Sequence, residues 1–275
     1  MFPQFQRLFL VLICFFVLVS SSAAQPPQGE WRASDKEYKA GMAALAKNDY
    51  NEAIAHLEKA IDLNPWNAQA EFNVANTYAE LYKPGVNDKS NSDLSDLAIQ
   101  HYRKVLQDNL LPFITASAAK NMARLYIRMG RFDDAKEVYS NRSTFNPNDP
   151  EPHYWIAVID WTGASQARQA EQAKLKMKPN EILAVKNIES CGKLNSANWS
   201  NVDEGIQQLN TALDLDPQFA DAMNYMSLLY RERAEIRCND PALRAADLKA
   251  AAGWQEKFAA AKKMKAAAGA STADR

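Results

Sequence analysis

A chain of 275 residues that is 47% hydrophobic and 24% charged has enough apolar residues for a folded core, so its composition excludes a wholly disordered protein. Its 32 basic and 33 acidic residues give a formal net charge of -1, which excludes the strongly basic balance of a nucleic-acid-binding protein. We therefore expect no nucleic-acid partner.

The first residues have the pattern of a secretory signal peptide. Arg7 precedes an apolar run that ends at Val19, and the small residues Ser22 and Ala24 suit cleavage directly after them. The run is shorter than the roughly 20 residues of a membrane span. We therefore expect residues 1–24 to be cleaved, which leaves no stable membrane span and an exported protein that is periplasmic or secreted. Retention of the segment as an anchor is the alternative.

A repeated spacing of small residues and prolines organises the rest of the chain. The spacing is twelve positions, and it is kept by Gly41, Ala53 and Pro65, by Ala123, Ala135 and Pro147, and by Gly205 and Pro217. The corresponding small residues of the other units are Ala75, Ala98, Ala157, Ser227 and Ala250. Small residues let two helices approach to about 8–10 Å, and proline ends the second helix. The spacing therefore predicts stacked helix pairs.

This pattern resembles that of tetratricopeptide-repeat (TPR) proteins, whose unit is a helix pair of about 34 residues. The resemblance implies an all-α, right-handed solenoid of about five pairs, with insertions in the second, fourth and fifth. The expected segments are a polar lead at 25–33, units at about 34–67, 68–115, 116–149, 150–219 and 220–265, and a flexible tail at 266–275.

Turn-forming residues and irregular lengths mark the insertions. In the second unit, residues 83–93 are expected to form a loop. The long insertion at 163–200 is expected to contain helices at 166–178 and 181–189. It either lies over the groove as a lid, projects as a separate contact surface, or packs on the solenoid. Cys191 and Cys238 are the two cysteines outside the leader, and an oxidising compartment would permit a disulfide between them. Two unrelated small residues are the other interpretation.

In the family that the sequence resembles, the first helices of the units line a concave groove. The residues at groove-facing positions are Tyr38, Phe72, Asn76, Lys120, Arg124, Arg128, Tyr154, Trp161, Asn224 and Arg231. Lys120, Arg124 and Arg128 are four positions apart, so they share one helical face and form a basic stripe. The stripe predicts a peptide partner with acidic groups or a free C-terminal carboxylate. A solvated face, or one paired with acidic residues of an insertion, is the alternative.

The resemblance implies an exported protein-interaction module or scaffold. One alternative is an architectural component of an envelope or secretion complex, which would use the convex face and the insertions; another is a small-molecule-binding accessory protein. Catalytic motifs are lacking, because His56, His101 and His153 are scattered and Glu52 with His56 lacks the second histidine of a zinc motif. We expect no enzyme activity, no cofactor and no metal.

Overall fold

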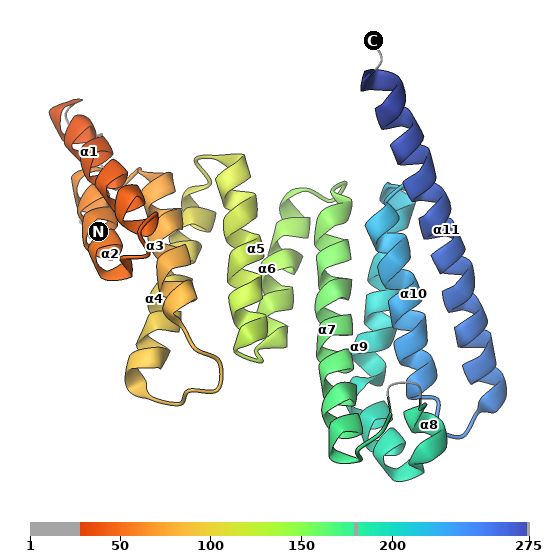
Figure 1. The fold of residues 1–275 in the computed structure, drawn as a ribbon. Helices are drawn as coiled ribbons and strands as arrows, with labels where there is room; N and C mark the ends of the chain where they lie inside the picture. Colours follow the sequence, from red (N-terminus) through yellow and green to blue (C-terminus); the bar gives the residue numbers. More distant parts are fainter. Residues whose placement is uncertain (1–27, 179–180, 274–275) are drawn as a thin grey trace, which may run out of the picture.

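A computed structural model describes residues 28–178 and 181–273, and every regular element in those residues is an α-helix (Figure 1). The helices are α1 (Gln28–Leu45), α2 (Tyr50–Leu63), α3 (Ala68–Leu81), α4 (Lys89–Asp108), α5 (Pro112–Arg128), α6 (Phe132–Phe145), α7 (Pro150–Lys174), α8 (Leu183–Lys186), α9 (Ile188–Leu215), α10 (Ala220–Glu235) and α11 (Pro241–Ala273). The all-α fold class predicted from the repeat is confirmed.

The helices pack in succession along the chain. α1 contacts α2, α3 contacts α4, α5 contacts α6, α7 contacts α9, and α10 contacts α11, while each of these pairs also contacts the next. One hydrophobic core runs from α2 to α7, and a second joins α7, α9, α10 and α11. The result is an extended, curved solenoid whose two ends lie far apart (Figure 1).

Side-chain caps and prolines fix the helix boundaries. Asp49 accepts a hydrogen bond from the backbone N–H of Glu52 at 3.2 Å, and Asn67 accepts one from Ala70 at 3.0 Å. Such caps satisfy N–H groups that have no partner within the helix. The three predicted stop prolines each follow the C-cap residue of a helix, after Asn64, Asn146 and Asp216.

The small residues of the repeat lie where the two helices of a pair cross. A Cβ atom on Gly41 of α1 would lie 2.8 Å from the Leu57 side chain of α2. One on Gly205 of α9 would lie 3.3 Å from Asp160 of α7, in the same pair, and 2.9 Å from Leu229 of α10, in the next pair. No side chain fits there without displacing its neighbour. The other buried small residues, each at most 2% exposed, are Ala53, Ala75, Ala98, Ala123, Ala135, Ala157 and Ser227.

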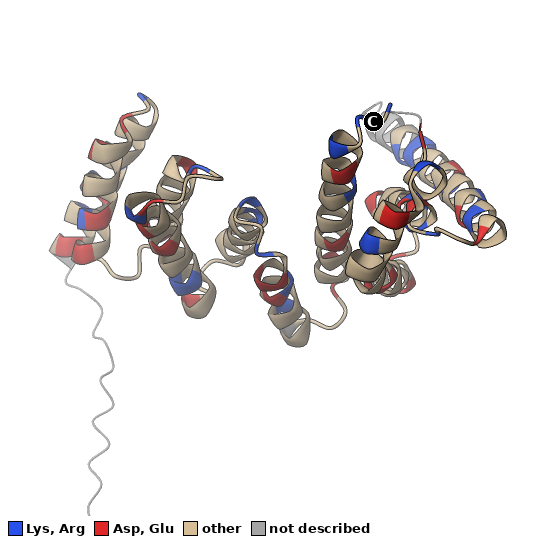
Figure 2. Cartoon of the chain, turned by 90° about the horizontal axis from the view of Figure 1, so that it is seen from below, with Lys and Arg blue, Asp and Glu red and all other residues tan. Residues whose placement is uncertain are grey.

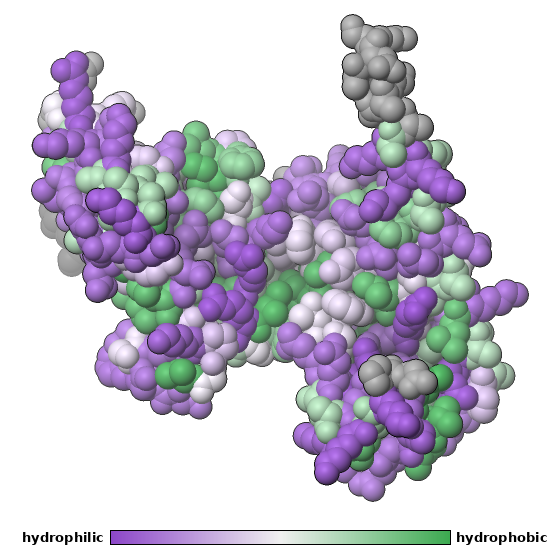
Figure 3. All heavy atoms as spheres, viewed as in Figure 1, coloured by the Kyte–Doolittle hydropathy of each residue, from purple (hydrophilic) through white to green (hydrophobic). Residues whose placement is uncertain are grey.

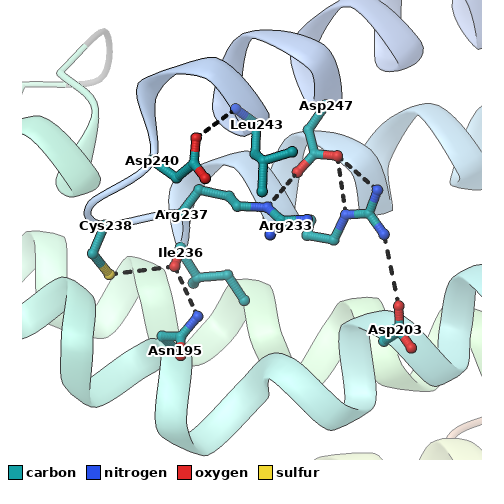
Figure 4. Close-up of polar contacts among 9 residues, drawn as sticks. All are labelled: Asn195, Asp203, Arg233, Ile236, Arg237, Cys238, Asp240, Leu243 and Asp247. Carbon is teal, nitrogen blue, oxygen red and sulfur yellow. Dashed lines mark hydrogen bonds and ion pairs between the residues drawn. The ribbon is translucent and has the colours of Figure 1, made fainter.

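The last helix has a different register from the predicted one. Ala250 is half-buried, whereas Ala251 is 1% exposed and takes the crossing position. The neighbouring Asp247 explains the shift, because Arg233 and Arg237 of the α10 end both donate to its buried carboxylate, at 2.6–3.1 Å (Figure 4). These bonds fix the rotation of α11 about its axis. The expected crossing residue was therefore wrong by one position.

The predicted loop at 83–93 is shorter in the structure. Helix α4 begins at Lys89, because Asp88 caps it by accepting from the backbone N–H of Asn91 at 2.8 Å. The Asn91 side chain then accepts from the Lys83 N–H and donates to the carbonyl oxygens of Lys83 and Val86. The last part of the predicted loop thus becomes the first turn of α4.

The long insertion at 163–200 lengthens helices of the solenoid. Its first part continues α7 to Lys174, and its second part supplies the start of α9. The helix expected at 181–189 was wrong: α8 has four residues, and Asn187 then caps α9. Leu183 is fully buried and α8 contacts α9 and α10, so the insertion packs on the solenoid.

Two further contacts fasten this end of the molecule. Arg168 of α7 donates to the buried carboxylate of Glu232 on α10 at 2.8 Å. Cys191 and Cys238 form a disulfide with their Cα atoms 5.6 Å apart, which joins α9 to the α10–α11 connection. The insertion is therefore held by core packing, an ion pair and a covalent bond.

The structure describes more of the C-terminal end of the chain, up to residue 273, than of the N-terminal end, where it begins at residue 28. The predicted signal peptide at 1–24 lies outside the described residues. Helix α1 begins at Gln28, so most of the expected polar lead at 25–33 is helical, and the α11 backbone continues through most of the expected flexible tail at 266–275. Alanine, which favours helix, supplies five of the eight tail residues up to Ala273. In the described residues, no helix combines the length and apolarity of a membrane span.

Candidate protein-binding surface

The ten residues predicted to face the groove lie on α1, α3, α5, α7 and α10, which are the first helices of the successive pairs. We call this surface the groove face. Figure 2 shows basic and acidic residues interspersed over the described part of the molecule, although the charged residues of α5 are all basic and those of α3 all acidic. Recognition on the groove face therefore depends on local arrangements of side chains and not on an electrostatic field of one sign over the whole surface.

A small polar pocket lies on the groove face between α3 and α5. The Asn76 Oδ1 atom accepts hydrogen bonds from the Tyr102 hydroxyl at 2.6 Å and from the Asn121 amide at 2.8 Å. These residues line a cavity of about 130 Å³ together with Ala79, Glu80, Arg124, Leu125 and Arg128, so its wall carries one carboxylate as well as two arginines. Burial raises the pKa of Tyr102 above its ordinary value, although the positive charges of the two arginines oppose the rise. The amide N–H groups of Asn76 and the Arg124 guanidinium are donors available to an anion or a carbonyl group.

Arg128 has a different role from the one predicted. Its two terminal nitrogens donate to the carbonyl oxygens of Ala79 and Tyr82 at 2.9 and 2.6 Å, and its guanidinium lies 5.6 Å from the Tyr82 ring centre. These carbonyls belong to the C-terminal end of α3, where a cation is favourable. Arg128 therefore holds α5 against α3, and its guanidinium is not available for a bidentate bond to a ligand.

The other two members of the predicted basic stripe are exposed. The Lys120 ammonium lies 5.0 Å from the ring centre of Trp155, a cation–π distance that joins α5 to α7. Arg124 makes no hydrogen bond or ion pair with any described residue. The three residues of the stripe therefore differ in role: Arg128 joins two helices, Lys120 lies over the Trp155 ring, and Arg124 is exposed beside the pocket.

An aromatic cluster occupies the groove face between α7 and α10. The ring of Tyr154 lies 4.9 Å from Phe219 and 5.5 Å from Tyr225, whose ring meets Trp161 edge-on at 5.4 Å. Burial raises the pKa of Tyr154 and of Tyr225, so both phenols stay neutral. The half-buried rings of Trp161 and Tyr225 offer flat apolar surface to the side chains of a peptide.

The remaining predicted residues lie at the edges of this surface. The Tyr38 hydroxyl accepts from the Asn73 amide at 3.2 Å, and the Phe72 ring packs 6.4 Å from Tyr102. Asn224 is half-buried and Arg231 is exposed. Sequence analysis missed Asn121, Trp155 and Tyr225. All three are next to predicted groove positions in the sequence, and their contacts could have been suspected only from the pairing of helices.

The three histidines belong to polar contacts at equivalent places in different helix pairs, His56 and His101 on the second helix and His153 on the first. Each histidine belongs to a polar pair that joins the two helices of one repeat. The residue on the first helix lies four positions before the small residue of that helix, and the residue on the second helix lies three positions after the small residue of that helix. The pairs are Glu37–His56 at 2.6 Å, Glu71–His101 at 2.7 Å and His153–Gln208 at 2.6 Å. The histidines therefore hold helix pairs together in separate parts of the molecule. In the described residues, no group of three His, Cys, Asp or Glu side chains could hold a metal ion.

One part of the chain matches a known family model. Residues 41–81 match the family model described as TPR repeat, and they cover the α1–α3 region in which the predicted spacing is clearest. This segment resembles a tetratricopeptide repeat. The match supports a TPR protein and the coarse assignment to protein-interaction modules, a class that is typically not catalytic. No curated protein matches the sequence.

Solved structures of similar architecture include TPR proteins. MamA from Desulfovibrio magneticus RS-1 is 14% identical, with a TM-score of 0.47 over 84% of this chain and 96% of that chain. YrrB, described as a TPR protein with an unusual peptide-binding site, is 14% identical, with a TM-score of 0.42 over 86% and 98%. A TPR protein from Parabacteroides merdae is 15% identical, with a TM-score of 0.37 over 84% and 99%.

Proposed function

We propose that this protein is an exported interaction module that binds an extended segment of a partner protein on its groove face. The observation that carries the proposal is the pairing of a donor pocket, formed by Asn76 and Arg124, with an aromatic surface formed by Trp161 and Tyr225. Such a surface suits a peptide that places an acidic group or its C-terminal carboxylate in the pocket and apolar side chains over the rings. The Cys191–Cys238 disulfide supports an oxidising compartment such as a periplasm or the exterior.

Arg124 is the residue expected to determine the preference for acidic peptides. Its guanidinium is exposed and unpaired with any described residue, so it can form charge-assisted hydrogen bonds without breaking a structural contact. Arg128 does not share this property, because its bonds to α3 would be lost. A test of binding should therefore change Arg124 and leave Arg128 intact.

Binding of labelled peptides, measured by fluorescence anisotropy, tests this function. The probes are random-sequence peptide pools of equal length that are rich in Asp and Glu with a free C-terminus, the same pools amidated, and pools with Asn and Gln instead. We expect the acidic pool to bind at least about tenfold more tightly, and Arg124→Glu to remove that preference. Lys249→Glu is the matched control, because it makes the same charge change on the exposed face of α11. Equal affinity for all pools would overturn the proposal.

An architectural role in an envelope complex is the second candidate, and the tip of the insertion supports it. Val185 is 64% exposed and Ile188 is 56% exposed, next to each other at the α8–α9 junction. Exposed apolar residues that lie together often mark a protein interface. If this surface carries the function, the double variant Val185→Asp and Ile188→Asp should lose a partner that Arg124→Glu still retains in affinity capture from an envelope extract.

A further inference from the structure

The third helix pair lacks the polar contact that joins the helices of other pairs. At the positions of Glu71 and His101 in the second pair, the third pair has Ala119 and Val138. In the fifth pair, on the register set by Ala251, these positions hold larger side chains, Met223 and Trp254. The third pair therefore has small apolar residues where the other pairs have a polar bridge or large side chains.

An open cavity of about 390 Å³ lies at this place, between α4, α5 and α6. Five apolar residues line it, Leu106, Pro112, Ala116, Ala119 and Val138, and polar or charged residues form the rest of its wall. A buried cavity of about 150 Å³ is enough to hold benzene. This cavity therefore has room for an aromatic side chain.

Exposed apolar residues flank the cavity at the α4–α5 connection. Leu110 is 42% exposed, Leu111 is 39% exposed and Phe113 is 83% exposed. They alternate with Asn109 and Pro112, which line the cavity. Figure 3 shows hydrophobic surface at this connection, at the top of the view. A protruding ring and a cavity that accepts a ring thus lie side by side on one surface, which we call the third-pair patch.

The charges around the third-pair patch are balanced in pairs. Arg142 lies 3.3 Å from Asp149 at the rim of the cavity, and Lys104 lies 2.7 Å from Asp108 on the neighbouring turn of α4. In a two-fold dimer each surface meets its own copy, so a patch with net charge would repel itself. This patch has no such excess, and its rim amides can form hydrogen bonds across the interface.

We propose that the third-pair patch binds a second copy of this chain in a two-fold dimer. The Phe113 ring of each copy enters the cavity between Ala119 and Val138 of the other, and Leu110 and Leu111 cover the contact. A central aromatic side chain in a pocket is the usual form of an interface hot spot. The dimer uses a different surface from the one that holds Asn76 and Arg124. Dimerisation and peptide binding can therefore be tested independently of each other.

Sedimentation velocity of the purified protein between about 1 and 200 μM tests the proposal, a range that covers dimers of moderate affinity. We expect concentration-dependent dimerisation. Phe113→Asp should weaken it at least tenfold, because a charge would be placed in an apolar cavity. The double variant Ala119→Glu and Val138→His should do the same, because it fills the cavity with the polar pair that α3 and α4 already use.

Arg124→Ala is the matched control on the other face of α5, and its dimerisation should equal that of the unchanged protein. A protein that stays monomeric at the highest concentration would overturn the proposal. A dimer whose affinity is changed neither by Phe113→Asp nor by the double variant would also overturn it. Circular dichroism checks the fold of the double variant, and if that variant unfolds, Phe113→Asp decides alone, since this side chain is mostly exposed and contributes little to the core.

Discussion

Asp160 is a buried carboxylate through which the stability of this fold should depend on pH. It is 3% exposed on α7, and its Oδ1 atom lies 2.9 Å from the Lys136 ammonium of α6. Lys136 also pairs with Glu204 of α9 at 3.0 Å, and the Asp160 Oδ2 atom has no hydrogen-bond partner among the described residues. Burial outweighs the attraction of Lys136 and raises the pKa of Asp160 to about 7.

The sign of the effect follows from the two states of the chain. In the unfolded chain the pKa of an aspartate is about 3.9, so the folded protein holds this proton more tightly. The stabilising contribution is then fully present below about pH 4 and is lost as the pH rises through 7. With a folded pKa of about 7, the loss between pH 5 and pH 8 is about 2.5 kcal/mol in the free energy of unfolding.

The variant Asp160→Asn removes this titration while it keeps the size of the side chain. Urea denaturation at pH 5 and pH 8 should show that the stability of the variant, relative to the unchanged protein, rises by about 2.5 kcal/mol between the two pH values. Asp62→Asn, at an exposed position of α2, is the control and should show no such rise. A relative stability that stays constant within about 0.5 kcal/mol would refute the reasoning, since no proton would then be taken up by the buried group.

Three other changes test the packing. Ala123→Arg should lower the free energy of unfolding by more than about 3 kcal/mol, because a charge replaces a residue that is 2% exposed; unchanged urea denaturation would show that the helix register is wrong. Arg128→Ala should cost about 1–3 kcal/mol through two lost bonds to α3, whereas Arg124→Ala should change stability by less than about 0.5 kcal/mol, and equal effects on the melting temperature would contradict these separate roles. Reduction of the Cys191–Cys238 disulfide, which closes a loop of sequence separation 47, should cost up to about 4 kcal/mol in urea denaturation, and a Cys191→Ser and Cys238→Ser variant should not respond to the reductant.

The groove face shows how far the sequence could lead in locating a site. The spacing of Lys120, Arg124 and Arg128 placed them correctly on one helix, but their chemistry depends on residues distant in the chain. Arg128 bonds to carbonyls 46 and 49 positions away, and Lys120 meets the Trp155 ring of another helix pair. Asn121 belongs to the pocket through a bond to Asn76, which no local pattern indicates.

The insertions show the same limit in the fold. Their composition indicated helix and turn, and the helical part of α7 was expected. Whether the extra residues would form a lid or lengthen the solenoid depended on Leu183, which is buried against distant helices, and on the bond from Arg168 to Glu232. These contacts join residues more than 40 positions apart, so the local sequence did not decide between the two arrangements.

By itself, the sequence determined the helical repeat, most helix ends and the small residues at the helix crossings. These features depend on local causes: proline and capping residues end or begin a helix, and a position such as Gly41 has no room for a side chain. Only the tertiary structure decided the register of α11, the separate role of Arg128 and the cavity beside Val138. Each of those results from side chains of different helices meeting in space, and a spacing along one chain carries no information about which partner a side chain will meet.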